Sequence, residues 1–186
     1  MQEHAAASLL TLSASSVNKP TISASGAIPL LVNILRYGSP QAKVDAVMAL
    51  YNLSTLPDNL NLILQAEPVP SIVHLLKTCK KSSKLAEKCI ALLETIVHFE
   101  EGRNALISED GGVLAVVEVL ESGSLHSREH AVSTLLIMCQ IDRCNYREPI
   151  LKEGVILGLL ALTVQGTSKS KEHPSPSQKQ KRFCSY

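Results

Sequence analysis

The stretch Gly26-AIPLLVNILRYGSPQAKVDAVMALYNLS-54 carries two apolar segments with a turn between them. Its first segment is dominated by Ile, Leu and Val and ends before Gly38-Ser39-Pro40, which is typical of a helix stop followed by a helix start. In residues 46–53 the apolar side chains recur at the spacing of one helical face. The stretch therefore predicts two consecutive helices joined by a tight turn.

The same pattern returns along the chain, with starts separated by 41, 44 and 42 residues. The apolar runs are Gly26-AIPLLVNIL-35, Glu67-PVPSIVHLL-76, Gly111-GVLAVVEVL-120 and Glu153-GVILGLLAL-162. The helical faces that follow are Ala46-VMALYNL-53, Cys89-IALLETI-96 and Ala131-VSTLLIM-138. Short lead-in segments precede the runs, at 18–25, 59–66, 103–110 and 146–153.

Three helices in a period of about 42 residues are typical of armadillo repeats. One such unit cannot bury its apolar faces alone, so neighbouring units must stack. We therefore expect an all-α, armadillo-type right-handed solenoid of about four three-helix repeats, incomplete at both ends. The expected units are a third helix of a truncated repeat at 1–16, repeats at 17–57, 58–100 and 101–143, an incomplete repeat at 144–173, and a disordered basic tail at 174–186.

The N-terminal stretch MQEHAAASLLTLSASS has two interpretations, a secretory signal or a helix of the first unit. Glu3-His4-Ala5 recurs as Glu129-His130-Ala131, and no positive residue stands in the first three positions. Both observations favour a third helix whose first two helices are absent.

At the other end, Pro174 and Pro176 stand where a third helix would continue, and proline stops a helix. We therefore expect the apolar face of 155–164 to be covered from one side only. Five Lys or Arg against one Glu give residues 166–186 a local charge of +4. This tail is interpreted as a solvated extension, as a nuclear signal or contact for an acidic surface, or as the product of an alternative transcript.

The amino-acid composition bears on the nature of the core, on binding to nucleic acid or membranes, and on disulfide bonding. Hydrophobic residues make up 45% of the chain and aromatic residues 3%, so the core must consist of Leu, Ile, Val and Ala. A net charge of +1 gives no bulk attraction to nucleic acid or to acidic membranes, and no apolar run is long enough to span a membrane. Five cysteines without a CxxC motif predict reduced thiols in a cytoplasmic or nuclear protein. Cys89 takes the small inward position of its repeat and is expected in the core.

Residues 26–54 and Ser127-REHAVSTLLIMC-139 resemble the armadillo repeats of plant U-box ubiquitin ligases and their relatives without a U-box. The resemblance covers residues 2 to about 173 and implies a platform that binds a ubiquitination substrate or a receptor-like kinase. Recruitment of a ubiquitin-charged E2 belongs to the U-box and is not carried over. Importin-like armadillo proteins read basic peptides with a Trp/Asn ladder, of which only Asn52 is present here. A nuclear transport receptor is therefore the weaker alternative, and a free-standing adaptor in signalling is the closer one.

In this family the third helices line the concave groove of the solenoid, so their outward residues are the expected partner-binding surface. An Asn amide there both donates and accepts, and Asn52 is expected to bond a peptide backbone. The predicted groove residues are Asp45, Met48, Asn52, Lys84, Lys88, Ala91, Thr95, His130, Ser133 and Ile137.

Other candidate sites are weaker. His126 and His130 are four apart, but the pattern is not HExxH, so no metal is expected. No motif gathers a nucleophile, base and acid, so neither catalysis nor a cofactor is expected. Lys77, Lys80, Lys81 and Lys84 form a basic cluster that fits an acidic partner or a solvated loop. Acidic residues between the repeats are expected to be solubilising loop surface: Asp58, Glu100, Glu101, Glu109 and Asp110.

Overall fold

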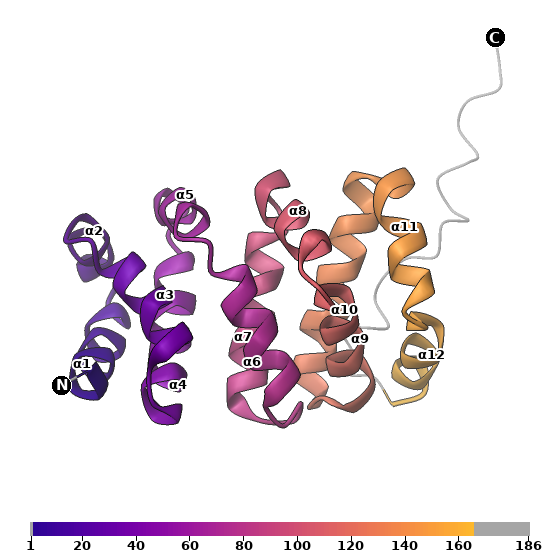
Figure 1. The fold of residues 1–186 in the computed structure, drawn as a ribbon, viewed down its shortest axis with the longest axis horizontal. Helices are drawn as coiled ribbons and strands as arrows, with labels where there is room; N and C mark the ends of the chain where they lie inside the picture. The colour runs from indigo at the N-terminus through magenta and orange to yellow at the C-terminus, as the bar shows by residue number, and fades with distance from the viewer. Residues whose placement is uncertain (1, 166–186) are drawn as a thin grey trace, which may run out of the picture.

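A computed structural model describes residues 2–165, which form twelve α-helices and one short 3-10 helix (Figure 1). Within this described part there is no strand. The all-α prediction is thus confirmed. The elements are α1 (Gln2–Ser13), η1 (Ser16–Asn18), α2 (Lys19–Ala24), α3 (Ala27–Tyr37), α4 (Pro40–Ser54), α5 (Asp58–Gln65), α6 (Val69–Thr78), α7 (Lys84–Ile96), α8 (Glu100–Ser108), α9 (Gly112–Ser122), α10 (Leu125–Ile141), α11 (Arg143–Lys152) and α12 (Val155–Gln165).

The helices stack in register as a solenoid. The third helices α1, α4, α7 and α10 each contact the next and form one layer. The second helices α3, α6, α9 and α12 form another layer in the same way. The first helices α2, α5, α8 and α11 lie along the upper edge in Figure 1. Helix α1 packs on α4 in the layer that α7 and α10 continue.

Each complete third helix begins at a serine cap. The side chains of Ser39, Ser83 and Ser124 accept hydrogen bonds from backbone N–H groups three residues later, at 3.3, 3.2 and 3.2 Å. Such caps satisfy a backbone donor that would otherwise lack a partner. They explain why the polar turn between second and third helices recurs even in the repeat that lacks its glycine.

A second repeated contact follows three of the four third helices, α1, α4 and α7, where the chain turns into the first helix of the next repeat. Asn18, Asn59 and Arg103 each donate a side-chain hydrogen bond to the carbonyl six residues earlier. The N···O distances are 3.1, 3.0 and 3.0 Å. Each of these residues is the first of its lead-in segment. The lead-in segment therefore begins with a hydrogen bond that fixes the turn between two repeats, which we call the corner contact.

The turn between first and second helices requires a left-handed backbone in every repeat. Its φ is +77° at Gly26, +51° at Glu67, +63° at Gly111 and +76° at Gly154. Glycine adopts this conformation without penalty, whereas Glu67 pays a steric cost. The alignment of the fourth apolar run at Glu153 is therefore wrong by one residue, because Gly154 occupies the turn position.

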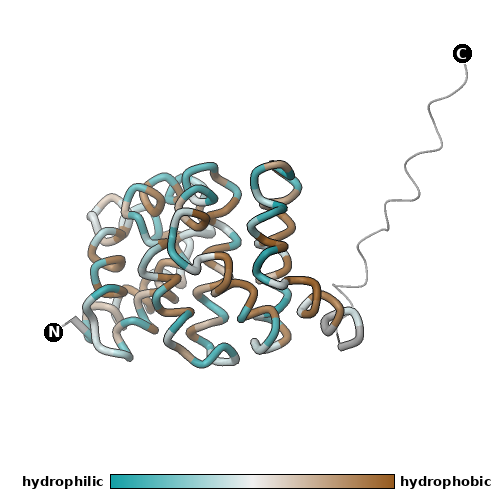
Figure 2. The backbone as a smooth tube through the Cα atoms, turned by 45° about the vertical axis from the view of Figure 1, so that its right-hand side comes forward, coloured by the Kyte–Doolittle hydropathy of each residue, from teal (hydrophilic) through white to brown (hydrophobic). Residues whose placement is uncertain are grey.

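The core is aliphatic, as expected, and Cys89 is fully buried within it. At the C-terminal end, α12 contacts α9 but no following second helix within the described residues. Four of its large side chains are 38–72% exposed, namely Ile156, Leu157, Leu159 and Leu160. Among the described second helices α12 thus packs on α9 alone, and Figure 2 shows its apolar character. No helix in residues 2–165 has the length and apolarity that crossing a membrane requires.

Candidate functional site

The predicted binding residues lie on the third-helix layer, and we call their exposed and half-exposed side the third-helix face. Two of them are not exposed as expected: Asp45 is 8% and Ala91 is 2% accessible. The reason is that α4 lies between α1 and α7, and α7 lies between α4 and α10. Side chains at the flanks of these helices are therefore covered by the neighbouring helix. Asp45 accepts a hydrogen bond from Gln41 at 3.0 Å.

Asn52 links α4 to the preceding third helix. Its amide nitrogen donates to the Oγ of Ser13 on α1 at 3.2 Å, and the side chain is half-buried. Asn52 therefore helps to hold two repeats together. A hydrogen bond from Asn52 to a partner would have to use the donor and acceptor capacity of its amide that the Ser13 contact does not occupy.

Lys88 makes the corresponding link between α4 and α7. Its ammonium lies 4.9 Å from the centre of the Tyr51 ring and 3.3 Å from the carboxylate of Glu87. A cation over an aromatic ring is attracted to its electron-rich face. Lys84, one turn earlier on the same helix, is exposed.

His130 links α7 to α10. Its Nδ1 lies 2.5 Å from a carboxylate oxygen of Glu94. Burial raises the pKa of the Glu94 carboxyl, but hydrogen bonds from His130 and Ser133 and the nearby charges of His130 and His98 outweigh it, so that pKa is lowered overall. The pair is half-buried, since the side chains are 32% and 27% exposed.

The remaining predicted residues lie partly open beside these links. Thr95 donates to the Ala91 carbonyl at 3.1 Å. Met48 and Ile137 are half-buried against the core, and Ser133 is half-buried near Glu94. The third-helix face thus presents short polar and apolar side chains on a layer that three inter-repeat contacts hold in place.

The basic cluster between α6 and α7 is partly used within the chain. Lys77 bonds the carbonyl of Asp110 and lies 3.5 Å from its carboxylate. Lys81 pairs with Glu118 at 2.9 Å. Both lysines therefore tie the second repeat to the third, while Lys80 and Lys84 are exposed.

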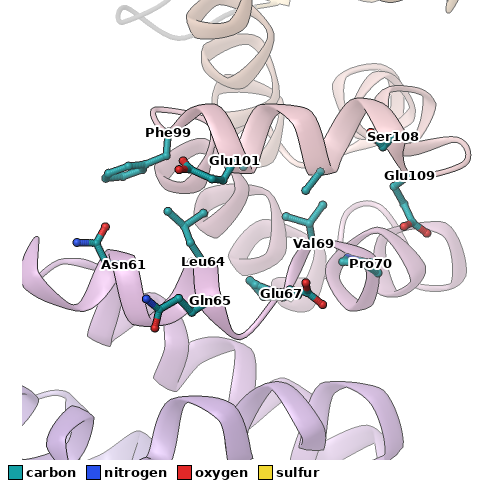
Figure 3. A pocket seen from close by; sticks show the side chains of 13 residues that line it. Asn61, Leu64, Gln65, Glu67, Val69, Pro70, Phe99, Glu101, Ser108 and Glu109 are labelled. Atoms are coloured by element: carbon teal, nitrogen blue, oxygen red, sulfur yellow. The ribbon is translucent and has the colours of Figure 1, made fainter.

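A second surface feature, which the sequence did not indicate, is a hollow between α5 and α8 (Figure 3). Its volume is about 680 Å³, within the range of ligand pockets. Glu101 was expected in a loop, but it lies in the first turn of α8 and faces this hollow. The lining residues are Asn61, Leu64, Gln65, Glu67, Pro68, Val69, Pro70, Phe99, Glu101, Gly102, Ala105, Ser108 and Glu109.

The described cysteines at 79, 89, 139 and 144 are free thiols. Burial raises the pKa values of the Cys79, Cys89 and Cys139 thiols, which disfavours the reactive thiolate. No three His, Cys, Asp or Glu side chains gather as metal ligands in residues 2–165. The two surface features that stand out in the described residues are the third-helix face and the α5–α8 hollow.

Comparisons with known proteins identify which family this chain resembles. The family model described as the plant U-box protein ARM repeat region matches residues 2–173. U-box domain-containing protein 45 of Arabidopsis thaliana is 36% identical over 165 residues, which cover 88% of this chain and 21% of that protein. U-box domain-containing protein 8 of the same plant is 32% identical over 153 residues, covering 81% of this chain and 39% of that protein. The chain thus spans less than half the length of these relatives.

Among solved structures, computationally designed armadillo repeat proteins for modular peptide recognition superpose with a TM-score of 0.78 at 18% identity, covering 90% of this chain and 70% of theirs. That similarity confirms the armadillo fold. The family model, which matches most of the chain, and the U-box relatives show that the chain belongs to the plant U-box protein armadillo repeat family.

Proposed function

We propose that this chain is a non-catalytic platform that binds a protein partner along its third-helix face. The observation that carries the proposal is the series of contacts Ser13–Asn52, Tyr51–Lys88 and Glu94–His130, each of which joins two neighbouring third helices. A surface that is already ordered loses less conformational entropy when a partner binds. The polar groups that converge here are used to join helices, which supports a binding role over a catalytic one.

The fold family supports the same proposal. One structural neighbour is described as designed for modular peptide recognition, and another was solved in complex with the peptide (KR)4. By analogy, an extended segment of a partner would lie across successive third helices. The half-exposed Met48, Thr95, Ser133 and Ile137 would supply contacts of mixed polarity along that path.

The finer proposal is a role in plant ubiquitin ligation, since the relatives are U-box proteins. The partner would be a ubiquitination substrate or a regulator of the receptor-like kinase class. An adaptor that acts in signalling without ubiquitination is the alternative. We propose the cytoplasm or the nucleus as its location, because the described free cysteines at 79, 89, 139 and 144 would stay reduced there.

The test is affinity capture from plant extract with the variant Asn52→Ala/Lys88→Ala, followed by identification of the captured proteins. The expected result is loss of most partners that the unmodified chain captures. The fold should persist, because one neutral hydrogen bond and one half-buried cation–π contact each contribute only about 1 kcal/mol.

The matched control is Asn33→Ala/Lys80→Ala, which changes the same residue types at exposed positions off the third helices. It should capture the same partners as the unmodified chain. Equal capture by all three proteins, with unchanged melting temperatures, would contradict the assignment of binding to the third-helix face.

A further inference from the structure

The α5–α8 hollow combines an apolar floor with an acidic rim. Leu64, Val69 and Phe99 are among the apolar residues that line it, and Figure 3 shows Leu64 and Val69 pointing toward α8, with Phe99 at one end of the hollow. Three glutamates, Glu67, Glu101 and Glu109, stand around them. The lining residues include no Lys, Arg or His. Such a surface favours a segment that offers an apolar side chain beside positive charges.

Glu67 is held at this rim in a strained backbone conformation. It is the non-glycine residue with positive φ in residues 2–165, and the other three repeats have glycine at the same turn. Its carbonyl accepts a hydrogen bond from Arg36 at 3.2 Å, which helps to fix the turn. Backbone strain that a neighbouring contact maintains is more frequent at functional sites than elsewhere. A carboxylate kept where glycine would fit better therefore points to a role for its charge.

A segment with the complementary chemistry is present in the same chain. Lys179-QKRFCSY-186 contains three positive charges, at Lys179, Lys181 and Arg182, followed directly by Phe183. This segment lies outside the described residues. It pairs three cations with an adjacent aromatic side chain, as the hollow pairs three carboxylates with an apolar floor.

The intervening chain is long enough to connect the two. Thirteen residues, 166–178, separate the end of α12 from Lys179, and they span up to about 45 Å when extended. Helix α12 packs on α9, and α9 packs on α6, whose first residues line the hollow. Two steps between packed helices amount to about 20 Å.

We propose that the α5–α8 hollow is the docking site for the chain's own basic segment 179–186, with Phe183 on the apolar floor and the three cations at the three glutamates. No lining residue belongs to a third helix. The docking site is therefore separate from the third-helix face, and either proposal can fail without the other.

The test places the photo-reactive amino acid benzoylphenylalanine at position 183 of the full chain and maps the cross-links by mass spectrometry. The expected cross-links join position 183 to residues 58–70 or 99–109 within the monomer. The variant Glu101→Gln/Glu109→Gln keeps the strained turn intact and should lower the yield of these cross-links about fivefold, since each surface ion pair contributes modestly. Salt at 1 M should lower the yield similarly, because it screens exposed charges.

The single variant Glu67→Gly distinguishes docking from folding. It relieves the backbone strain, so the melting temperature should rise by about 2 °C, while the cross-link yield falls about twofold. A matched control, Glu121→Gln/Glu153→Gln, removes two carboxylates away from the hollow and should leave the yield unchanged. Three results would overturn the proposal: cross-links only in a dimer band, which would identify a second copy as the occupant; cross-links scattered over other helices; or equal yields in the hollow and control variants.

Discussion

Helices α6 and α12 occupy the same place in two successive stages of the solenoid and have very different surroundings. Val73 and Leu160 are equivalent, since each follows the left-handed residue of its turn by six positions, yet they are 0% and 58% exposed. The difference arises because α6 packs between α3 and α9, whereas α12 packs on α9. In a stacked protein, burial depends on the neighbours on both sides as much as on the apolarity of the helix itself.

The largest expected effect on stability comes from shortening an apolar side chain of the second-helix layer, once in the interior helix α6 and once in the terminal helix α12. Ile72→Ala on α6 removes a fully buried side chain and should cost about 2–5 kcal/mol of unfolding free energy. Leu160→Ala on α12 removes an exposed one and should cost less than about 1 kcal/mol. Urea denaturation followed by circular dichroism measures both. Equal losses would break the comparison, because they would mean that α12 is covered in solution.

The corner contacts, in which a side chain bonds the carbonyl six residues earlier, allow a second comparison between the interior of the stack and its end. Arg103 is 7% exposed and donates to the carbonyls of Val97 and His98 at 3.0 Å each. Its Nε is buried and has no hydrogen-bond partner within residues 2–165, which offsets part of the gain. Arg103→Met should still destabilise the fold by about 2–3 kcal/mol, because it leaves the buried Val97 carbonyl unpaired.

The matched variant at the N-terminal end is Asn18→Ala, whose corner hydrogen bond is exposed to solvent. Water can replace that bond, so the expected loss is about 0.5 kcal/mol. Thermal unfolding of the two variants side by side measures the difference. A loss at Asn18 as large as that at Arg103 would show that depth in the stack is irrelevant to the corner contact.

A smaller effect concerns the pH dependence of stability, which should differ between the half-buried Glu94–His130 pair and the exposed Glu148–Lys152 pair. The lowered pKa of Glu94 means that its carboxylate stabilises the folded state at pH values above its ordinary pKa of 4.5, and that this contribution is lost as the pH falls below that value. Because the pair is partly open to solvent, the loss should be at most about 1 kcal/mol. Glu94→Gln should remove this part of the acid dependence.

The comparison variant is Glu148→Gln on α11. The hydrogen bond from Lys152 and its charge also lower the pKa of Glu148, but this carboxylate is fully exposed. Its acid dependence should match that of the unmodified chain in denaturation curves recorded at pH 3 to 6. If Glu94→Gln behaved in the same way, the His130 contact would contribute nothing to the stack.

The helices and their order follow from the sequence because an apolar face and a polar turn are local patterns. The sequence aligns the start of the fourth apolar run at Glu153 because acidic and small residues both begin these runs, and only the backbone shows that Gly154 takes the left-handed position. Asp45 was expected on the surface because its burial depends on the neighbouring helices of the stack.

The candidate site could be predicted only in part for the same reason. The partner of Asn52 is Ser13, 39 residues earlier, and the period that aligns the repeats does not show which polar side chains meet across them. The α5–α8 hollow was missed because its walls come from two repeats. One signal was present: Glu67 stands where glycine recurs.

Hydrogen exchange of the 186-residue chain as a monomer tests most directly the claim that stacking on both sides gives this scaffold its stability. The account predicts that amides of α6 exchange at least about 100-fold more slowly than those of α12, since local opening is easiest where few apolar contacts are made. Protection of α12 equal to that of α6 in the monomer would contradict it.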